Sequence, residues 1–231
     1  MVHDKELVYD RLVTNNDWEV SNNPYETNRR IRVIFDKLLA PSELNGKTFL
    51  DVGSGGGHFS KVAEGLNAKV FSLDVGFNLL REVAKRCHSQ RLIGSVNELP
   101  IKKNSFDIVL CTEVIEHTQD PLHAIKELSH ITKNDGLLII TTPSRLWNPF
   151  VNMVTSLGLR HFEGYENFLW SWEIKKVLQK FGFKIEKLIG FNFCPIFNKR
   201  LDILFNLFDR IYGDKIPWLM LNIGVRARKK T

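Results

Sequence analysis

The chain alternates between short, continuous apolar runs and longer segments in which apolar residues recur every three or four positions. Short runs are typical of buried strands, whereas the longer spacing is typical of helices with one apolar face. Strands are predicted over 47–52, 69–73, 91–93, 106–111, 137–142, 183–189 and 219–225. Helices are predicted over 28–40, 58–66, 79–87, 121–131, 171–181 and 198–212. Strands that alternate with helices indicate an α/β fold with a parallel sheet covered on both faces.

Two stretches interrupt this alternation. The first 27 residues are polar and rich in asparagine, and the segment 143–170 is aromatic and contains Gly158 and Gly164. We therefore expect four parts in the chain. They are an N-terminal helical segment or lid over 1–44, a ligand-binding core over 45–142, an inserted cover over the acceptor at 143–170, and the rest of the sheet over 171–231 with an amphipathic helix at 198–212.

The net charge of +6 is concentrated in the last part of the chain. Residues 142–231 hold 15 basic and 7 acidic side chains, a local net charge of +8, together with 16 of the 25 aromatic residues. A basic, aromatic part suits a nucleic acid, a membrane surface or a well-solvated exterior. The whole chain is 43% hydrophobic and 25% charged, which excludes disordered, collagen-like and disulfide-scaffold proteins.

Cysteine usage and the absence of long apolar runs bear on localisation. The 3 cysteines are widely spaced and form no C-x-x-C pair, which predicts reduced thiols and a cytoplasmic protein. The N-terminus, MVHDKELVYD, lacks the apolar core of a signal peptide. No run of about 18 uncharged apolar residues is present to span a bilayer. A cytoplasmic protein of this kind can also bind peripherally to a membrane surface, and we keep this as an alternative.

A glycine-rich turn links the strand over 47–52 to the following helix. Its sequence is Asp51-Val52-Gly53-Ser54-Gly55-Gly56-Gly57. Alternate glycines let the backbone approach a ligand without a side-chain clash, and the helix start beyond them favours a negative group. Asp74 ends the next strand 17 residues after Gly57 and supplies a carboxylate for the two hydroxyls of a ribose. The turn and this carboxylate together predict a ribose-containing cofactor.

The spacing of the glycines argues against a dinucleotide. The dinucleotide pattern G-x-G-x-x-G would place its third glycine at position 58, where the chain has His58. The chain also lacks room for two mononucleotide-binding halves. A dehydrogenase is therefore a distant alternative.

The order Asp51-Val52-Gly53-x-Gly55-x-Gly57, then Asp74, resembles the class I S-adenosylmethionine (SAM) dependent methyltransferases. The resemblance extends through 94–100, 105–109 and 128–137 and covers about residues 45–142. It implies a Rossmann-like, mostly parallel seven-stranded sheet with a reversed last hairpin, and SAM as the cofactor. The cofactor contacts that it implies are Asp51, Gly53, Ser54, Gly55, Gly57, Asp74, Val75, Ser95, Val96, Cys111 and Thr112. Ser95 departs from the acidic residue that often binds the adenine amino group in this family.

A narrower resemblance is to the O-methyltransferases of ubiquinone biosynthesis, which methylate polyprenylated phenols. It rests on the segments 73–77, 111–121 and 190–195, whereas the cover over 143–170 is not closely similar. Asn23-Pro24 and Arg29-Arg30 resemble the family's N-terminal Asn-Pro-x-Arg segment, whose arginine reaches the cofactor. The spacing differs here, and we take Arg30 as the candidate.

Glu113, Glu116 and His117 follow the fourth predicted strand. On a helical turn this spacing would place all three side chains on one face. Two carboxylates and an imidazole suit a divalent cation such as Mg²⁺, or a general acid/base pair. Related methyltransferases of quinone precursors and of RNA 2′-hydroxyls use a Glu-x-x-Glu-His arrangement for a metal, and His161 is the candidate fourth ligand here. The alternative is that these side chains line a pocket without a metal, with His117 and Glu113 as the catalytic residues.

The expected chemistry is methyl transfer to an acceptor hydroxyl, for which the protein supplies proximity, orientation and a base. A small, apolar or lipid-like acceptor is favoured by the aromatic cover and by the narrower resemblance. A polar metabolite or glycan, or an RNA 2′-hydroxyl, is the alternative acceptor. Nucleic acid ranks lower because no recognised RNA-binding module is visible. A SAM-binding regulatory protein is the alternative outside the enzymes.

Overall fold

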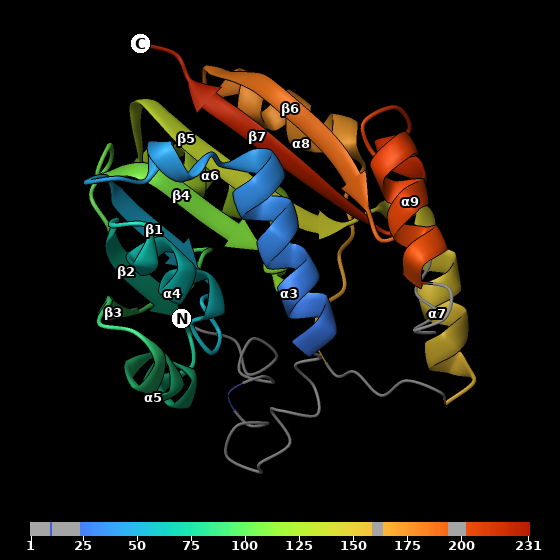
Figure 1. Cartoon of the computed structure of the whole chain (residues 1–231), viewed down its shortest axis with the longest axis horizontal. Coiled ribbons are helices and arrows are strands. Elements are labelled where there is room, and N and C mark those ends of the chain that lie inside the picture. The colour runs from blue at the N-terminus through green and yellow to red at the C-terminus, as the bar shows by residue number, and fades with distance from the viewer. Residues whose placement is uncertain (1–9, 11–23, 159–163, 194–201) are drawn as a thin grey trace.

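The computed structural model describes Asp10 and residues 24–158, 164–193 and 202–231. They form a seven-stranded sheet with the order β3-β2-β1-β4-β5-β7-β6 (Figure 1). β1 to β5 run parallel, and β7 lies antiparallel between β5 and β6. The predicted mostly parallel sheet with a reversed last hairpin is thereby confirmed. The strands are β1 (Thr48–Val52), β2 (Lys69–Asp74), β3 (Gln90–Ile93), β4 (Phe106–Thr112), β5 (Thr132–Pro143), β6 (Phe183–Phe191) and β7 (Asn222–Lys229).

Helices cover both faces of this sheet. One apolar cluster joins the sheet to α6 and α8, and a second joins it to η2 and α4. Strands buried on both faces need continuous apolar runs, which is why β4 is buried from Ile108 to Thr112. The α-helices are α3 (Pro24–Arg32), α4 (His58–Gly65), α5 (Phe77–Arg86), α6 (Pro121–Ile131), α7 (Asn148–Ser156), α8 (Ser171–Lys180) and α9 (Asp202–Tyr212). The shorter helical turns are η2 (Val33–Leu38), η3 (Pro41–Glu43), η4 (Ile115–His117), η5 (Arg145–Trp147) and η6 (Pro217–Leu219).

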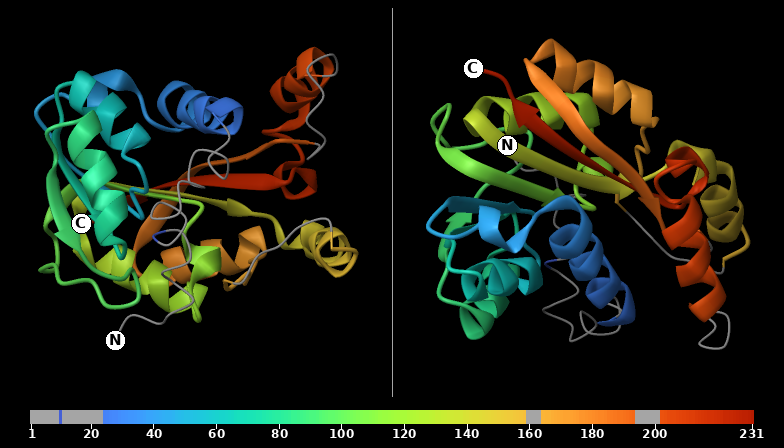
Figure 2. Two further views of the ribbon diagram at one scale, coloured as in Figure 1. Left: turned by 90° about the horizontal axis from the view of Figure 1, so that it is seen from below. Right: turned by 45° about the horizontal axis from the view of Figure 1, so that its top comes forward.

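The parallel strands finish at a common edge of the sheet, where α/β folds bind their ligands. α3 crosses in front of the ends of β4 and β5, and α7 and α9 lie beyond the arrowhead of β5 (Figure 1). Seen from below, α7 and α9 stand on opposite sides of the β6–β7 hairpin (Figure 2). These helices come from sequence segments far apart, and together they frame the carboxyl end of the sheet.

Several element boundaries differ from the prediction; the strand predicted over 137–142, for example, already begins at Thr132. The helix predicted over 28–40 already begins at Pro24, because proline suits a first helical turn, and it ends in the π-helical turn η2. The strand predicted over 219–225 is instead Asn222–Lys229, so Arg226, Arg228 and Lys229 belong to β7. Residues 198–201 of the helix predicted over 198–212 lie outside the described residues. None of the helices in the described part is long and apolar enough to cross a membrane.

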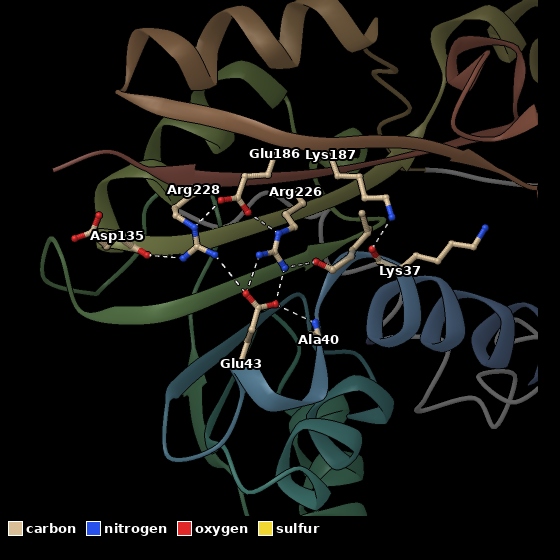
Figure 3. Close-up of polar contacts among 9 residues, drawn as sticks. Lys37, Ala40, Glu43, Asp135, Glu186, Lys187, Arg226 and Arg228 are labelled. Carbon is tan, nitrogen blue, oxygen red and sulfur yellow. Dashed lines mark hydrogen bonds and ion pairs between the residues drawn. The ribbon is translucent and has the colours of Figure 1, made fainter.

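The arginines of β7 form a paired network near the edge where the strands begin (Figure 3). Arg226 donates to Glu43 of η3 at 2.6 Å and to Glu186 of β6 at 2.7 Å. Arg228 donates to Glu186 at 2.6 Å. Glu43 thus ties the loop before β1 to the β6–β7 hairpin, and both arginines are engaged within the fold.

Candidate active site

The glycine-rich turn lies between the ends of β1 and β2. The amides of Gly53 and Ser54 both donate to the Leu73 carbonyl, at 2.8 and 3.0 Å. Gly53 has a φ of 68°, a left-handed conformation that residues with a side chain rarely adopt. A Cβ built on Gly53 would lie 2.2 Å from Cγ2 of Val114, so the turn directly touches the segment after β4. Glycine is therefore required here both for the backbone shape and for this contact.

Asp74 lies at the end of β2, beside the glycine-rich turn. Its carboxylate accepts hydrogen bonds from the amides of Gly55 and Gly76, each at 2.9 Å. Burial raises the pKa of Asp74 to about 6, although these hydrogen bonds act in the opposite direction. The position suits an acceptor for ribose hydroxyls next to the turn.

Asp51 occupies a different position, between β1 and α4. Only 1% of the residue is exposed, and its Oδ2 accepts a hydrogen bond from the Ser60 hydroxyl at 2.7 Å. Burial raises the pKa of Asp51 to about 7, against the hydrogen bonds from Ser60. The structure thus shows Asp51 tying the start of the glycine-rich turn to the helix that follows.

The loop after β3 lies against the end of β2. Its first amide donates to the Asp74 carbonyl at 3.0 Å, and Ser95 and Val96 in this loop are buried. Val75 follows Asp74 directly and is half-buried. The structure therefore brings Val75, Ser95 and Val96 to the same end of the sheet as Asp74.

Two buried hydroxyl groups beside the turn, Ser54 Oγ and Thr112 Oγ1, have no hydrogen-bond partner in the described structure. Val52 pairs with Cys111 across β1 and β4, and Ser54 lies two residues after the end of β1 while Thr112 is the last residue of β4, so both hydroxyls are at neighbouring strand ends. Buried polar groups are normally hydrogen-bonded, and these hydroxyls fit contacts with a polar ligand. The thiol of Cys111 stays protonated because burial raises its pKa well above the usual value.

Glu113 follows β4 and adopts a φ of 53°, which is uncommon for a residue with a side chain. The Thr141 hydroxyl donates to its Oε1 at 2.8 Å, and the Asn222 amide donates to its Oε2 at 2.6 Å. Burial raises the pKa of Glu113 to about 7, with nearby Arg30 lowering it and Glu116 raising it further. A carboxyl that titrates near neutrality can accept a proton from a hydroxyl.

Arg30 reaches this carboxyl from α3. Its Nη2 lies 3.8 Å from Glu113 Oε2 and 3.2 Å from Glu26 Oε2. Its Nε is buried and has no hydrogen-bond partner among the described residues. The structure therefore places Arg30 at the carboxyl end of the sheet, with donor capacity for an anionic group.

Glu116 and His117 lie on η4 and point to different partners. Thr142 donates to Glu116 Oε2 at 3.0 Å, and burial raises the pKa of Glu116 to about 7. His117 Nδ1 lies 2.9 Å from the Tyr165 carbonyl. The prediction of one helical face for these residues and Glu113 is wrong, because Glu113 precedes the helical turn in a left-handed conformation.

The proposed metal ligands do not converge. Among the described residues, no group of three or more His, Cys, Asp or Glu side chains is arranged to hold a metal ion. Glu113 and Glu116 instead accept hydrogen bonds from threonine hydroxyls on β5. His161 lies outside the described residues. The described geometry therefore does not support the predicted divalent cation.

Sequence reasoning missed a buried polar chain that surrounds Glu113. Asn222 of β7 donates to Glu113, and Asn192, just after β6, donates to Asn222 Oδ1 at 2.9 Å. Asp209 of α9 accepts hydrogen bonds from the backbone amide of Asn192 at 2.7 Å and from the Arg29 side chain of α3. No local motif signals these contacts, since 109 residues separate Glu113 from Asn222.

This chain is similar in sequence to known methyltransferases. A family model described as a methyltransferase domain matches residues 50–140. The ubiquinone biosynthesis O-methyltransferase of Glaesserella parasuis is 26% identical over 185 residues, which are 72% of this chain and 76% of that protein. The protein of the same name from Nitrosospira multiformis is 27% identical over 174 residues, 67% of this chain and 70% of the relative.

Solved structures share the fold across nearly the whole chain. A SAM-dependent methyltransferase from Thermotoga maritima has a TM-score of 0.70 and 19% identity, and the match covers 98% of this chain and 100% of that one. A SAM-dependent methyltransferase from Mesorhizobium loti has a TM-score of 0.63 and 14% identity, covering 87% of this chain and 96% of that one.

The strand order, the glycine-rich turn and the comparisons agree. The matched domain spans β1 to β5, the part of the sheet that carries the turn, Asp74 and the end of β4. The buried, unpartnered hydroxyls of Ser54 and Thr112 provide polar groups that suit a cofactor beside the turn. The chain is therefore a class I SAM-dependent methyltransferase, similar to the O-methyltransferases of ubiquinone biosynthesis.

Proposed function

We propose that the protein methylates a phenolic hydroxyl on a small, apolar or lipid-like acceptor of the quinone-precursor type. The observation that carries the proposal is the position of Glu113. This mostly buried carboxyl, with a pKa of about 7, immediately precedes Val114, whose side chain touches the glycine-rich turn. A proton acceptor therefore lies beside the part of the fold proposed to hold the methyl donor.

The residues proposed to hold SAM are those that the structure gathers around the turn. Asp74 would accept the ribose hydroxyls, and the loop with Ser95 and Val96 would flank the adenine. Ser54, Thr112 and Arg30 offer polar groups for the amino acid part of the cofactor. SAM supplies an electrophilic methyl group, so the protein mainly provides proximity and orientation. Asp51 would support the turn through Ser60.

A base must take the proton from the acceptor hydroxyl. Glu113 is the first candidate because it combines burial with a pKa near neutrality. His117 is the second. A carbonyl oxygen only accepts hydrogen bonds, so the contact with Tyr165 places the hydrogen of a neutral ring on Nδ1 and makes Nε2 the basic nitrogen. Both groups belong to the segment that follows β4.

The surface near the carboxyl end of the sheet supports an apolar acceptor. Met153 of α7 and Leu157 just after this helix are 49% and 64% exposed, and Leu207 and Ile211 of α9 are 50% and 43% exposed. Apolar side chains on helices that frame a site favour an apolar ligand over a sugar or a nucleic acid. We extend the proposal to the segments 1–44 and 143–170 as lid and cover, and to peripheral contact with a membrane surface where a lipid-like acceptor resides.

The basic C-terminal part gives less support to RNA than its charge suggests. Arg226 and Arg228 are paired with Glu43 and Glu186 within the fold (Figure 3). Neutralised arginines do not contribute to a phosphate-binding surface in the way that unpaired ones do. We therefore do not propose RNA as the acceptor, and we include it as one probe in the test below.

The test is methyl transfer from labelled SAM to four probes. They are a catechol with a short isoprenoid chain, the same catechol without the chain, a sugar and total RNA. We expect transfer to both catechols, with the lower KM for the prenylated one. Label only in RNA or in the sugar would overturn the proposed acceptor. Lack of transfer to every probe, despite SAM binding, would also contradict it.

A further inference from the structure

Asp209 anchors α9 over the carboxyl end of the sheet. The residue is 6% exposed, and its Oδ2 accepts hydrogen bonds from Arg29 of α3 and from the Asn192 amide. Its Oδ1 accepts a hydrogen bond from the Phe193 amide at 2.9 Å. One carboxylate thus joins α9, α3 and the end of β6.

Asp209 is also connected to Glu113, the proposed base, through contacts of α3 and of the ends of β6 and β7. Arg29 reaches Asp209, while the next residue, Arg30, lies 3.8 Å from Glu113. From Asp209 a second connection runs through Asn192 and Asn222 to Glu113. Asp209 and Glu113 are therefore linked on two sides, once through α3 and once through the ends of β6 and β7.

Among the described side chains of α9, the contacts other than those of Asp209 do not orient the helix as strictly. On its inner side, Phe208 packs on Phe193 with ring centroids 4.0 Å apart, and apolar contact is non-directional. On its outer side, Leu207 and Ile211 are exposed. A charge-assisted hydrogen bond has strict geometry, so the buried carboxylate helps to fix how α9 sits over the site, together with the 2.7 Å hydrogen bond from the Gly190 amide to the Gly213 carbonyl just after the helix.

A buried ion pair seldom adds much net stability, because desolvation offsets the attraction between the charges. Its best-supported use is to select one arrangement among several that would pack similarly. The buried ion pair of Asp209 lies at α9, the helix that bears exposed apolar residues next to the proposed acceptor site. The location favours a role in binding the acceptor over a role in holding SAM.

We propose that Asp209 is a positioning residue for the acceptor: through Arg29 and the backbone after β6 it sets α9 as one wall of the acceptor site. This inference rests on the proposed function, because the acceptor is the apolar phenol proposed above. The described partners of Asp209 are Arg29 and the backbone amides of Asn192 and Phe193, so we assign it no contact with the reacting atoms. Its loss should therefore weaken acceptor binding while SAM binding persists.

The experiment compares Asp209→Asn with wild type on the prenylated and the unprenylated catechol. We expect the KM for the prenylated catechol to rise about tenfold or more and the KM for the unprenylated one to rise less, with SAM affinity within about twofold of wild type. The matched control is Asp214→Asn, which makes the same chemical change at an exposed residue just after α9. It should leave all these values unchanged.

Arg29→Lys is the second variant, for the case that Asp209→Asn does not fold. It keeps the positive charge but loses the planar donor geometry, so the KM for the prenylated catechol should rise by a smaller factor. Arg32→Lys, at an exposed position on the same helix, is its control. The double variant Arg29→Lys/Asp209→Asn should match Asp209→Asn alone, since both changes break one interaction.

The outcomes separate the two proposals. If wild type methylates the catechols and the KM values of Asp209→Asn and Arg29→Lys equal those of wild type, the positioning role is overturned and the proposed function stands. Equal losses for both catechols together with weakened SAM binding would indicate a general structural role and would also overturn it. If wild type methylates neither catechol, both proposals fail.

Discussion

Carboxyl groups at the two ends of the sheet have opposite properties. Near the end where the parallel strands begin, Glu43, Asp107 and Glu186 are partly exposed and contact cations. Hydrogen bonds from Arg226 lower the pKa of Glu43. Burial raises the pKa of Asp107, but hydrogen bonds from Thr48 and Lys133 outweigh it and bring the value to about 2. These groups stay charged throughout the neutral range.

At the end where the strands finish, the carboxyl groups are buried, and burial is the first cause of their pKa shifts. The pKa values are about 7 for Asp51, about 6 for Asp74, and about 7 for Glu113 and Glu116. Among these four, a cation within 4 Å is described only for Glu113. Their partners are mainly hydroxyl and amide donors.

The difference separates carboxylates that hold the fold together from carboxylates suited to chemistry. An ion pair near water satisfies both charges and adds modest stability. A buried carboxyl with few cations can change its protonation state near neutral pH, which a base requires. Variants at the two ends should therefore affect different measurements.

The largest effect is expected for Asp74→Ala. It removes the proposed acceptor for two ribose hydroxyls, each a charge-assisted hydrogen bond of about 1.5–3 kcal/mol, so SAM affinity should fall by about 100-fold or more. Isothermal titration calorimetry measures this directly. Asp214→Asn, an exposed residue away from the turn, is the control. Wild-type SAM affinity in Asp74→Ala would refute the ribose assignment.

Glu113→Gln should act on turnover. The amide keeps the size of the side chain but cannot take a proton, so kcat should fall by about 100-fold to 1,000-fold. SAM affinity, measured by the same calorimetry, should stay within about threefold of wild type. Glu127→Gln, the same change at a partly exposed position on α6, should retain wild-type kcat. A wild-type kcat in Glu113→Gln would move the role of base to His117.

The pH dependence of kcat/KM sharpens this assignment. A base acts only when deprotonated, and burial raises the pKa of Glu113 to about 7, so activity should be low at pH 5 and rise through about pH 7. In Glu113→Gln the residual activity should lack this rise. An unchanged profile in the variant would show that another group causes it.

At the opposite end, Glu43→Gln should change stability and leave kinetics intact. Loss of the contacts with Arg226 and Arg228 should cost about 1 kcal/mol at neutral pH, a modest value because the groups are partly exposed. The folded-state pKa of Glu43 is lowered, so its contribution is present above the usual value of 4.5 and is lost as pH falls through the lowered value. Thermal melts of wild type and variant should therefore differ at pH 7 and converge in acid. A fall in kcat with unchanged melting would contradict the structural assignment.

The smallest effect is expected for Thr141→Val. Thr141 donates to Glu113 at 2.8 Å and stabilises the charged carboxylate, so its removal should raise the pKa of Glu113 further. The pH–rate profile should move upward by a few tenths of a unit, as expected for loss of one hydrogen bond of about 1 kcal/mol or less. A shift toward lower pH would show that Glu113 does not cause the profile.

Local sequence patterns were sufficient to predict helices and strands whose ends are set by interactions between neighbouring residues. The helix predicted over 121–131 is found as Pro121–Ile131, since Asp120 accepts hydrogen bonds from the next two free amides and Pro121 suits the first turn. The last strand was predicted over 219–225, three to four residues too early, because arginines usually face water at a strand end. In the fold, Glu43 and Glu186 pair with Arg226, and β7 continues to Lys229.

The same distinction applies to the site. The glycine-rich turn and Asp74 could be identified from sequence, because a strand end, glycine and a carboxylate at fixed spacing are local features. The spacing of Glu113, Glu116 and His117 was misleading, because helical geometry was assumed where Glu113 has a φ of 53°. Tertiary neighbours on β5 and β7 set the direction of its side chain instead.

The sequence by itself determined the α/β alternation, the glycine-rich turn, the Asp74 carboxylate and hence the methyltransferase class. Only the tertiary structure decided which carboxyls are buried and raised in pKa and which are paired with arginines. It also decided that α9 and α3 meet through Asp209 and Arg29, 180 residues apart. The physical reason is that periodicity and turn chemistry act over a few residues, whereas desolvation and ion pairing depend on neighbours that the fold brings from distant parts of the chain.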